Sequence, residues 1–109
     1  MEVWHGRNDS VREPRFEEGM FGMAFVCGSS PREAFTTGET VDCYEVLCEK
    51  FAEMRVVDIR SPEAVRDYVS SGSADADIII YPYQSQCSSD AYLMAFLTER
   101  SFECLELVD

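Results

Sequence analysis

Short apolar runs that end at glycines or polar turn residues predict strands along most of the chain. Residues 1–5 form the first run, which ends at Gly6, and residues 20–27 contain the second, which is bracketed by Gly22 and Gly28. The remaining candidates are the β-branched run 56–59 and three segments of the second half: 77–81, 92–97 and 102–108.

Two Ser-Pro pairs predict the starts of helices. The sequence Ser-Pro-Arg-Glu at 30–33 combines a capping serine, a proline at the first helical position and an acid in the first turn. It predicts a short helix that ends near Thr36. The sequence Ser-Pro-Glu at 61–63 opens a second helix, in which the apolar residues of 64–69 lie along one face.

The segment from Thr40 to Met54 has two readings. Its apolar residues from Tyr44 onward recur at spacings of three and four, which favours an amphipathic helix, whereas the residues around Cys43 also permit the start of a strand. We expect the helix. Together these elements predict an α+β domain spanning residues 1–109, with about five mostly antiparallel strands and about three short helices.

The composition agrees with one folded domain. With 109 residues there is no room for a second core, and a hydrophobic content of 46% is enough to bury one. Apolar stretches are a few residues long, well below the roughly 20 that a membrane-spanning helix needs. Because the first residues show no basic segment followed by an apolar one, we expect a cytoplasmic protein.

Acidic residues outnumber basic ones by 21 to 9, which gives a formal net charge of −12. This charge argues against direct binding to nucleic acid. Between residues 33 and 49 there is no base, and the acids there are candidates for binding a basic partner protein: Glu39, Asp42, Glu45 and Glu49. The alternative is an ordinary solvated surface.

Cysteine and histidine give little sign of a metal site. The five cysteines have no Cys-x-x-Cys spacing, so we expect reduced thiols and no metal. His5 is the one histidine, and any catalytic arrangement that needs an imidazole must use it. It ends the first predicted strand beside Gly6, where its ring could meet a ligand or simply bind a neighbouring group.

Three short motifs follow one another in the first 46 residues. They are His5-Gly6, the Gly-x-Phe-Gly-x-x-Phe segment at 19–25, and Ser-Pro-x-x-Ala at 30–34. In this order they resemble the ADP-ribosyltransferases, and within that family the phage-encoded anti-CRISPR members that act on type I surveillance complexes. The resemblance implies an ADP-ribosyltransferase-like fold and a site of action in the cytoplasm of a bacterial host cell.

The resemblance also implies a site for NAD. His5 and Gly6 would hold the ribose, and Phe21, Gly22 and Phe25 would support the nicotinamide pocket. Phe35 stands where the family's stacking residue lies, and it could equally belong to the core.

The family's catalytic acid has no clear counterpart, because no glutamate lies between Glu63 and Glu99. Asp90 is the candidate that could act as a base or stabilise positive charge, with Gln84 and Gln86 as uncharged alternatives.

Three functions remain open. The protein could transfer ADP-ribose from NAD to the DNA-recognising subunit of a type I CRISPR complex, whose basic surface would then reject DNA. It could instead act without a cofactor, as an acidic DNA mimic that occludes that surface. It could also be an acidic interaction protein unrelated to CRISPR defence. The oligomeric state is open.

Overall fold

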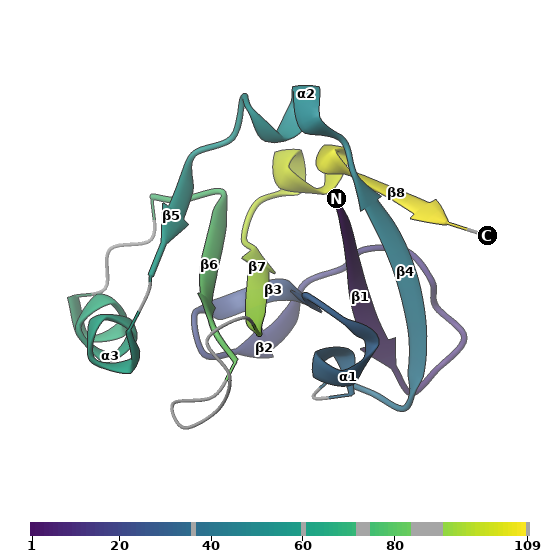
Figure 1. Cartoon of the computed structure of the whole chain (residues 1–109), viewed down its shortest axis with the longest axis horizontal. Coiled ribbons are helices and arrows are strands. Elements are labelled where there is room, and N and C mark those ends of the chain that lie inside the picture. Colours follow the sequence, from purple (N-terminus) through teal and green to yellow (C-terminus); the bar gives the residue numbers. More distant parts are fainter. Residues whose placement is uncertain (36, 60, 72–74, 84–90, 109) are drawn as a thin grey trace.

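One mixed sheet carries most of the regular structure (Figure 1). The computed structural model describes residues 1–35, 37–59, 61–71, 75–83 and 91–108. Neighbouring strands are antiparallel except for the parallel pair β5–β6. In spatial order the strands are β5 (Val56–Asp58), β6 (Ile78–Pro82), β7 (Tyr92–Phe96), β3 (Gly22–Gly28), β1 (Glu2–Arg7), β4 (Thr40–Val46) and β8 (Leu105–Val108), and β2 (Glu17–Gly19) pairs with β3 alone.

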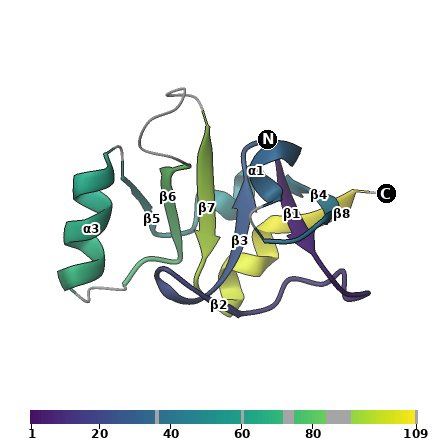
Figure 2. The ribbon, with the colours of Figure 1, turned by 90° about the horizontal axis from the view of Figure 1, so that it is seen from below.

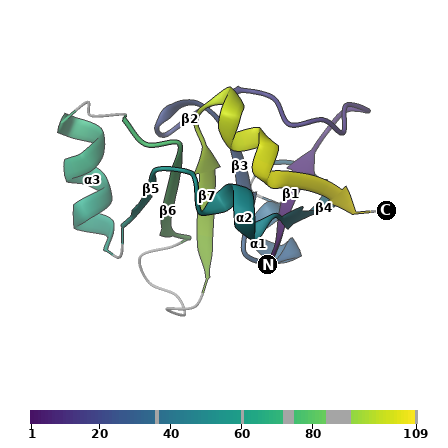
Figure 3. The same cartoon turned by 90° about the horizontal axis from the view of Figure 1, so that it is seen from above.

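In the part of the chain that the structure describes, three α-helices and one 3₁₀ helix complete the domain. Helix α1 (Pro31–Ala34) and helix α3 (Pro62–Ser71) begin at the two prolines, which confirms both predicted starts. Helix α3 connects the parallel strands β5 and β6, and it lies at the β5 end of the sheet (Figures 2 and 3). Helix α2 (Cys48–Phe51) is one turn long and lies beside the 3₁₀ helix η1 (Glu99–Cys104) (Figure 3).

The α+β class is as predicted, but the count of about five strands is wrong, since the described residues alone form a sheet of eight. The main error is the helix expected from Thr40 to Met54. Residues 40–46 form β4, because Asp42, Tyr44 and Val46 alternate toward the buried face and β1 and β8 pair with the two edges of this strand. The helical spacing arises because Phe51 and Met54, after β4 has ended, pack against the same core.

The last predicted strand also begins later than expected. Residues 99–104 form the helix η1, whose cap Thr98 accepts a hydrogen bond from the Ser101 amide through its hydroxyl (3.2 Å). Strand β8 therefore starts at Leu105. A capping threonine followed by Glu99 is an N-terminal helix signal that the apolar residues of this segment obscured.

The central strands are apolar on both faces, and this produces two clusters of buried side chains. On one face Val3, Phe25, Tyr44, Met94 and Phe96 are almost inaccessible to solvent. On the other face the buried side chains come from α3, β3, β5–β7 and the segments beside them: Ala24, Ile59, Val65, Ala76, Ile79, Tyr81, Leu93 and Ala95. Within the described residues, no helix is both long and apolar enough to cross a membrane.

Candidate functional site

The His5 side chain lies where the pairing between β1 and β3 stops. These strands are in register at Trp4 and Gly28, and beyond that point the imidazole bridges them, because its Nδ1 lies 2.7 Å from the Val26 carbonyl oxygen. The ring stacks on Phe25 with centroids 4.1 Å apart and is 4% exposed. The ring is thus held in one orientation by a hydrogen bond and a stacking contact.

The second ring nitrogen of His5 faces a carboxylate. Its Nε2 lies 3.3 Å from Oε1 of Glu17, on the short strand β2. A carbonyl can only accept, so Nδ1 carries a proton, and in the neutral ring Nε2 is then an acceptor. Burial lowers the pKa of His5, although the hydrogen bond to Val26 and the charge of Glu17 act in the opposite direction.

Gly6 allows the chain after α1 to lie directly on β1. A Cβ atom at this position would lie 2.2 Å from the Ala34 carbonyl oxygen and 2.4 Å from that of Gly38. The Gly6 amide donates to Oγ1 of Thr37 at 3.0 Å. Glycine is therefore required at this position for packing, whatever it does for a ligand.

A pocket of about 450 Å³ is lined by residues of β2, β3, β6 and β7 and by Thr37, and His5 and Gly6 are not among its lining residues. This volume lies within the range of roughly 300 to 1,000 Å³ that is usual for small-molecule sites. Apolar side chains of β3 and β7 form part of its wall, and its polar groups come from Glu17, Glu18, Thr37, Tyr81 and Tyr83. The pocket is connected to His5 through Glu17 and to Gly6 through Thr37, because these two lining residues contact them.

The hairpin between β2 and β3 forms the neighbouring wall. Gly19 and Gly22 are opposite each other, and Gly22 has a φ of +89°, a conformation that favours glycine. The Phe21 ring, in the turn between them, packs against Tyr81 at 4.9 Å and Tyr68 at 6.2 Å. Phe21 therefore supports a tyrosine of the pocket.

The other predicted ligand residues do not line the pocket either. Phe25 is 1% exposed and packs under His5, so it supports the imidazole and presents no free face to a ligand. Phe35 is 60% exposed at the end of α1 and is neither a core residue nor a lining residue of this pocket. Asp90, Gln84 and Gln86 lie outside the described residues.

The four predicted partner-binding acids do not form one surface. Asp42 is buried, and its carboxylate binds Arg7 at 2.6 Å and Arg12 at 3.3 Å, so it presents no free charge to a partner. Glu39 and Glu49 are exposed at separate places in the fold, before β4 and in α2. Glu45 lies in the middle of β4.

Glu45 belongs to a row of like charges that the sequence did not reveal. It is opposite Glu2 of β1 and Glu106 of β8, so three glutamates cross three neighbouring strands on the outward face. The N-terminal amine contacts Glu45 at 3.3 Å. We call Glu2, Glu45 and Glu106 the glutamate row. Like charges directly opposite each other destabilise a sheet.

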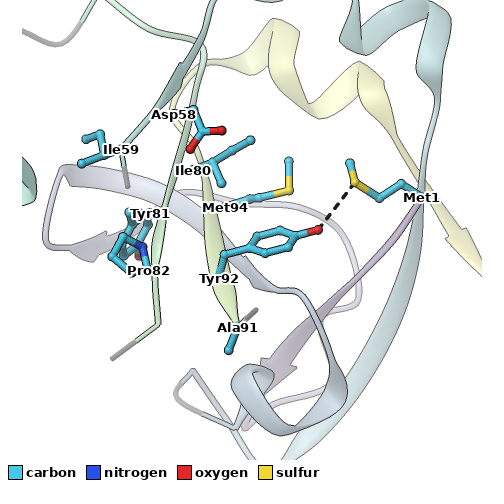
Figure 4. Close-up of a pocket in the computed structure, with 9 residues that line it drawn as sticks. All are labelled: Met1, Asp58, Ile59, Ile80, Tyr81, Pro82, Ala91, Tyr92 and Met94. Carbon is cyan, nitrogen blue, oxygen red and sulfur yellow. Dashed lines mark hydrogen bonds between the residues drawn. The ribbon is translucent and has the colours of Figure 1, made fainter. Parts of the chain in front are cut away.

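A second, smaller pocket of about 220 Å³ lies near the N-terminus (Figure 4). Ile80, Met94 and Tyr92 line it, and the Tyr92 hydroxyl points to the sulfur of Met1 at 3.7 Å. Its volume is below the usual range for ligand sites, and, like the larger pocket, it is lined by none of the residues predicted to bind NAD.

The sequence pointed to His5 and Gly6 but missed Glu17 and Thr37. Glu17 is 12 residues from His5 and Thr37 is 31 residues from Gly6, so their contacts exist only after the hairpin and α1 have folded onto β1. The Glu-Glu-Gly sequence before the hairpin turn was the available signal for Glu17.

Across the described parts of the chain, no group of three or more histidine, cysteine, aspartate or glutamate side chains is placed to hold a metal ion. The four described cysteines are free, and Cys27 and Cys104 among them are buried. No family model matches the chain, and no curated protein or solved structure matches it.

Proposed function

We propose that this protein is an NAD-dependent mono-ADP-ribosyltransferase of the anti-CRISPR type, with the DNA-recognising subunit of a type I CRISPR complex as its target. One observation carries the proposal. Glu17, which contacts His5, and Thr37, which contacts Gly6, line the same pocket as Gly19 and Met20 of the glycine-flanked hairpin, and this pocket has the volume of a ligand site. The ADP-ribosyltransferase-like fold is part of the proposal.

The transfer needs no oxidant or reductant. The bond between the ribose C1′ and the nicotinamide nitrogen breaks, and nicotinamide leaves as a neutral base with the electron pair. A nucleophilic side chain of the target forms the new bond to C1′ and gives its proton to a base, for which Asp90 remains the candidate. The added phosphates would repel DNA from the modified surface.

The chain's own residues would bind and orient NAD. His5 is fixed by Val26 and Phe25, so its Nε2 can accept a hydrogen bond from a ribose hydroxyl without losing side-chain entropy on binding. Gly6 keeps Thr37 at the edge of the pocket through its amide. Phe21 and Gly22 hold the hairpin against Tyr81, which lines the pocket.

Mass spectrometry of a purified type I complex, incubated with the protein with and without NAD, tests this function. We expect an NAD-dependent gain of one ADP-ribose on one subunit. His5→Gln should abolish the gain, whereas the exposed Glu63→Gln on α3 should retain it, with circular dichroism showing that both variants fold. If the protein inhibits the complex while the mass of every subunit stays unchanged, the proposed transferase activity is contradicted.

The glutamate row favours a second candidate, an acidic protein that occludes the basic DNA-binding surface without a cofactor. Three aligned carboxylates on an outward face destabilise the free protein, and a basic partner would relieve their repulsion. In this case Glu45→Lys with Glu106→Lys should weaken inhibition. The double variant Glu63→Lys, Asp67→Lys on α3 makes the same charge change and should not weaken inhibition. His5→Gln should not weaken inhibition either.

A further inference from the structure

We propose that the open edge of β8 is a docking site for an extended, basic segment of a partner protein, which pairs with β8 as a further antiparallel strand. Among the described residues, β8 ends the strand order of the sheet, so no strand covers its second edge (Figure 1). The functions proposed above name a basic target surface, and this inference goes beyond them by naming the mode of contact. It does not depend on NAD.

The backbone groups at this edge follow from the pairing of β4 with β8. The Leu47 amide donates to the Cys104 carbonyl at 2.8 Å, and hydrogen-bonded pairs alternate along an antiparallel ladder. The amide and carbonyl of Glu106 therefore point to β4, and those of Leu107 point to the open edge. The Leu105 carbonyl also points to this edge, whereas its amide donates to a carbonyl of η1. An added strand thus meets both donors and acceptors.

The glutamate row ends at this edge and gives it a negative charge. Glu106 is the outermost member, and it forms no ion pair with any described residue, whereas Glu45 contacts the N-terminal amine. One charge on the edge strand is enough to discourage aggregation through the edge. Glu2 and Glu45 lie on inner strands, where they do not protect the edge and where their repulsion destabilises the sheet. The row therefore fits a positively charged strand beside it.

An apolar row lies next to the glutamate row on the same face. Trp4, Cys43 and Val108 are opposite one another across β1, β4 and β8. The Cys43 thiol lies 3.6 Å from the Glu2 carboxylate, which shows that the two rows adjoin. Val108 is 40% exposed, so the apolar row also reaches the open edge. Strand β8 therefore presents one carboxylate among apolar side chains.

The complementary segment has a lysine or arginine opposite Glu106, with apolar residues on either side of it. Because the backbone of Glu106 points to β4, the new pair is of the non-hydrogen-bonded kind, in which Cα atoms are about 4.5 Å apart and side chains are closest. Opposite charges stabilise such a pair, and the apolar neighbours cover Leu105 and Leu107. A second copy of this chain fits less well, because each copy has a net charge of −12 and adds its own glutamates.

An NMR titration of the whole protein tests the docking site, with a capped peptide that has a central lysine, a valine on each side of it and a threonine at each end. The Leu107 amide should exchange with solvent quickly in the free protein and become protected when the peptide binds. The Glu106 amide, which is bonded to β4, should be protected in both states.

Methylation of the peptide's amides tests the pairing itself. N-methylation of the two valines should weaken binding by about 10-fold or more, because their amides donate to the Leu105 and Leu107 carbonyls. N-methylation of the lysine is the matched control, because its amide points away from β8, and it should leave the affinity unchanged. Equal losses for both methylated peptides would overturn the antiparallel pairing.

The role of charge is tested by reversing it. Glu106→Lys should weaken binding of the lysine peptide by about 5- to 10-fold and strengthen binding of the same peptide with glutamate in place of lysine. Glu63→Lys on α3 makes the same charge change at the other end of the sheet and should do neither (Figure 2). Equal binding of the two peptides to the original protein would overturn the selection for a basic segment.

Two results would overturn the docking site as a whole. In one, neither peptide protects the Leu107 amide. In the other, this amide is already protected in the free protein and the protein is a dimer, which would make a second copy the occupant of the edge. Both results leave the transferase activity untouched, because the mass of the target subunit tests that activity separately.

Discussion

Asp77 links three segments of the chain, and its replacement gives a prediction with a defined magnitude. This carboxylate, just before β6, is 7% exposed and accepts hydrogen bonds from the Arg55 amide at 3.0 Å and the Thr98 hydroxyl at 2.8 Å. Arg100 donates to it through Nε at 3.1 Å and through a terminal nitrogen at 2.9 Å. Asp77→Asn removes the charge while keeping the shape of the side chain.

The magnitude follows from the pKa of Asp77. Its hydrogen bonds with Arg100 lower the pKa from 3.8 to about 2, and each pKa unit corresponds to about 1.36 kcal/mol. The difference is therefore about 2 kcal/mol, but solvent screens the pair because the Arg100 side chain is 56% exposed. We expect Asp77→Asn to lower the free energy of unfolding by about 1 to 2 kcal/mol at pH 7.

Urea unfolding of the original protein and of Asp77→Asn, at pH 7 and pH 3, tests both the size of the stability difference and its electrostatic cause. A lowered pKa in the folded state stabilises above pH 3.8, and this stabilisation is lost as the pH falls toward 2. The difference in the free energy of unfolding between the two proteins should thus shrink by roughly half at pH 3. Asp75→Asn is the control, because that side chain is 79% exposed and lies 3.9 Å from Arg55. A gap that stays constant between pH 7 and pH 3, or an equal loss in Asp75→Asn, would refute the reasoning.

Three further predictions concern the sites on and around β1. Gly6→Ala should destabilise the protein by about 3 kcal/mol, measured by urea unfolding, because the new Cβ would lie 2.2 Å from the Ala34 carbonyl oxygen; a loss below about 1 kcal/mol would contradict this packing. Glu106→Gln should raise the free energy of unfolding by a few tenths of a kcal/mol, more at low salt than at high salt, because it relieves repulsion from Glu45. His5 should titrate below pH 6.5 in an NMR experiment, since burial lowers its pKa, and acidification through that range should destabilise the original protein more than His5→Gln.

Signals within a few neighbouring residues predicted the elements whose structure does not depend on distant strands. Both proline-initiated helices were found, and strands β6 and β7 lie within one residue of the predicted segments. Strand β4 was not found, because its residues fit a helix and a strand equally well until β1 and β8 are present as neighbours. Strand β2 was missed because it has three residues and gains its conformation from pairing with β3.

In the candidate site, too, the sequence predicted the residues with a local signal and missed those whose contacts form only in the folded sheet. His5 and Gly6 were identified because a lone histidine beside a glycine is visible in the sequence. Glu17 could not be distinguished from the other acids, since its contact with His5 depends on how the hairpin packs against β1. Asp42 was taken for a surface charge for the same reason, because Arg7 and Arg12 reach it only in the folded sheet.

The position of β4 between β1 and β8 has a consequence for how the protein is made. Strands β1 and β8 both pair with this one strand, and β8 lies about 60 residues after it in the sequence. The sheet cannot be completed until β8 has left the ribosome, so β4 has an open edge while these 60 residues are synthesised. Pairings between such distant segments also slow folding. A nascent chain stalled before β8 should therefore remain sensitive to protease and depend on chaperones, whereas the released chain closes this edge by itself.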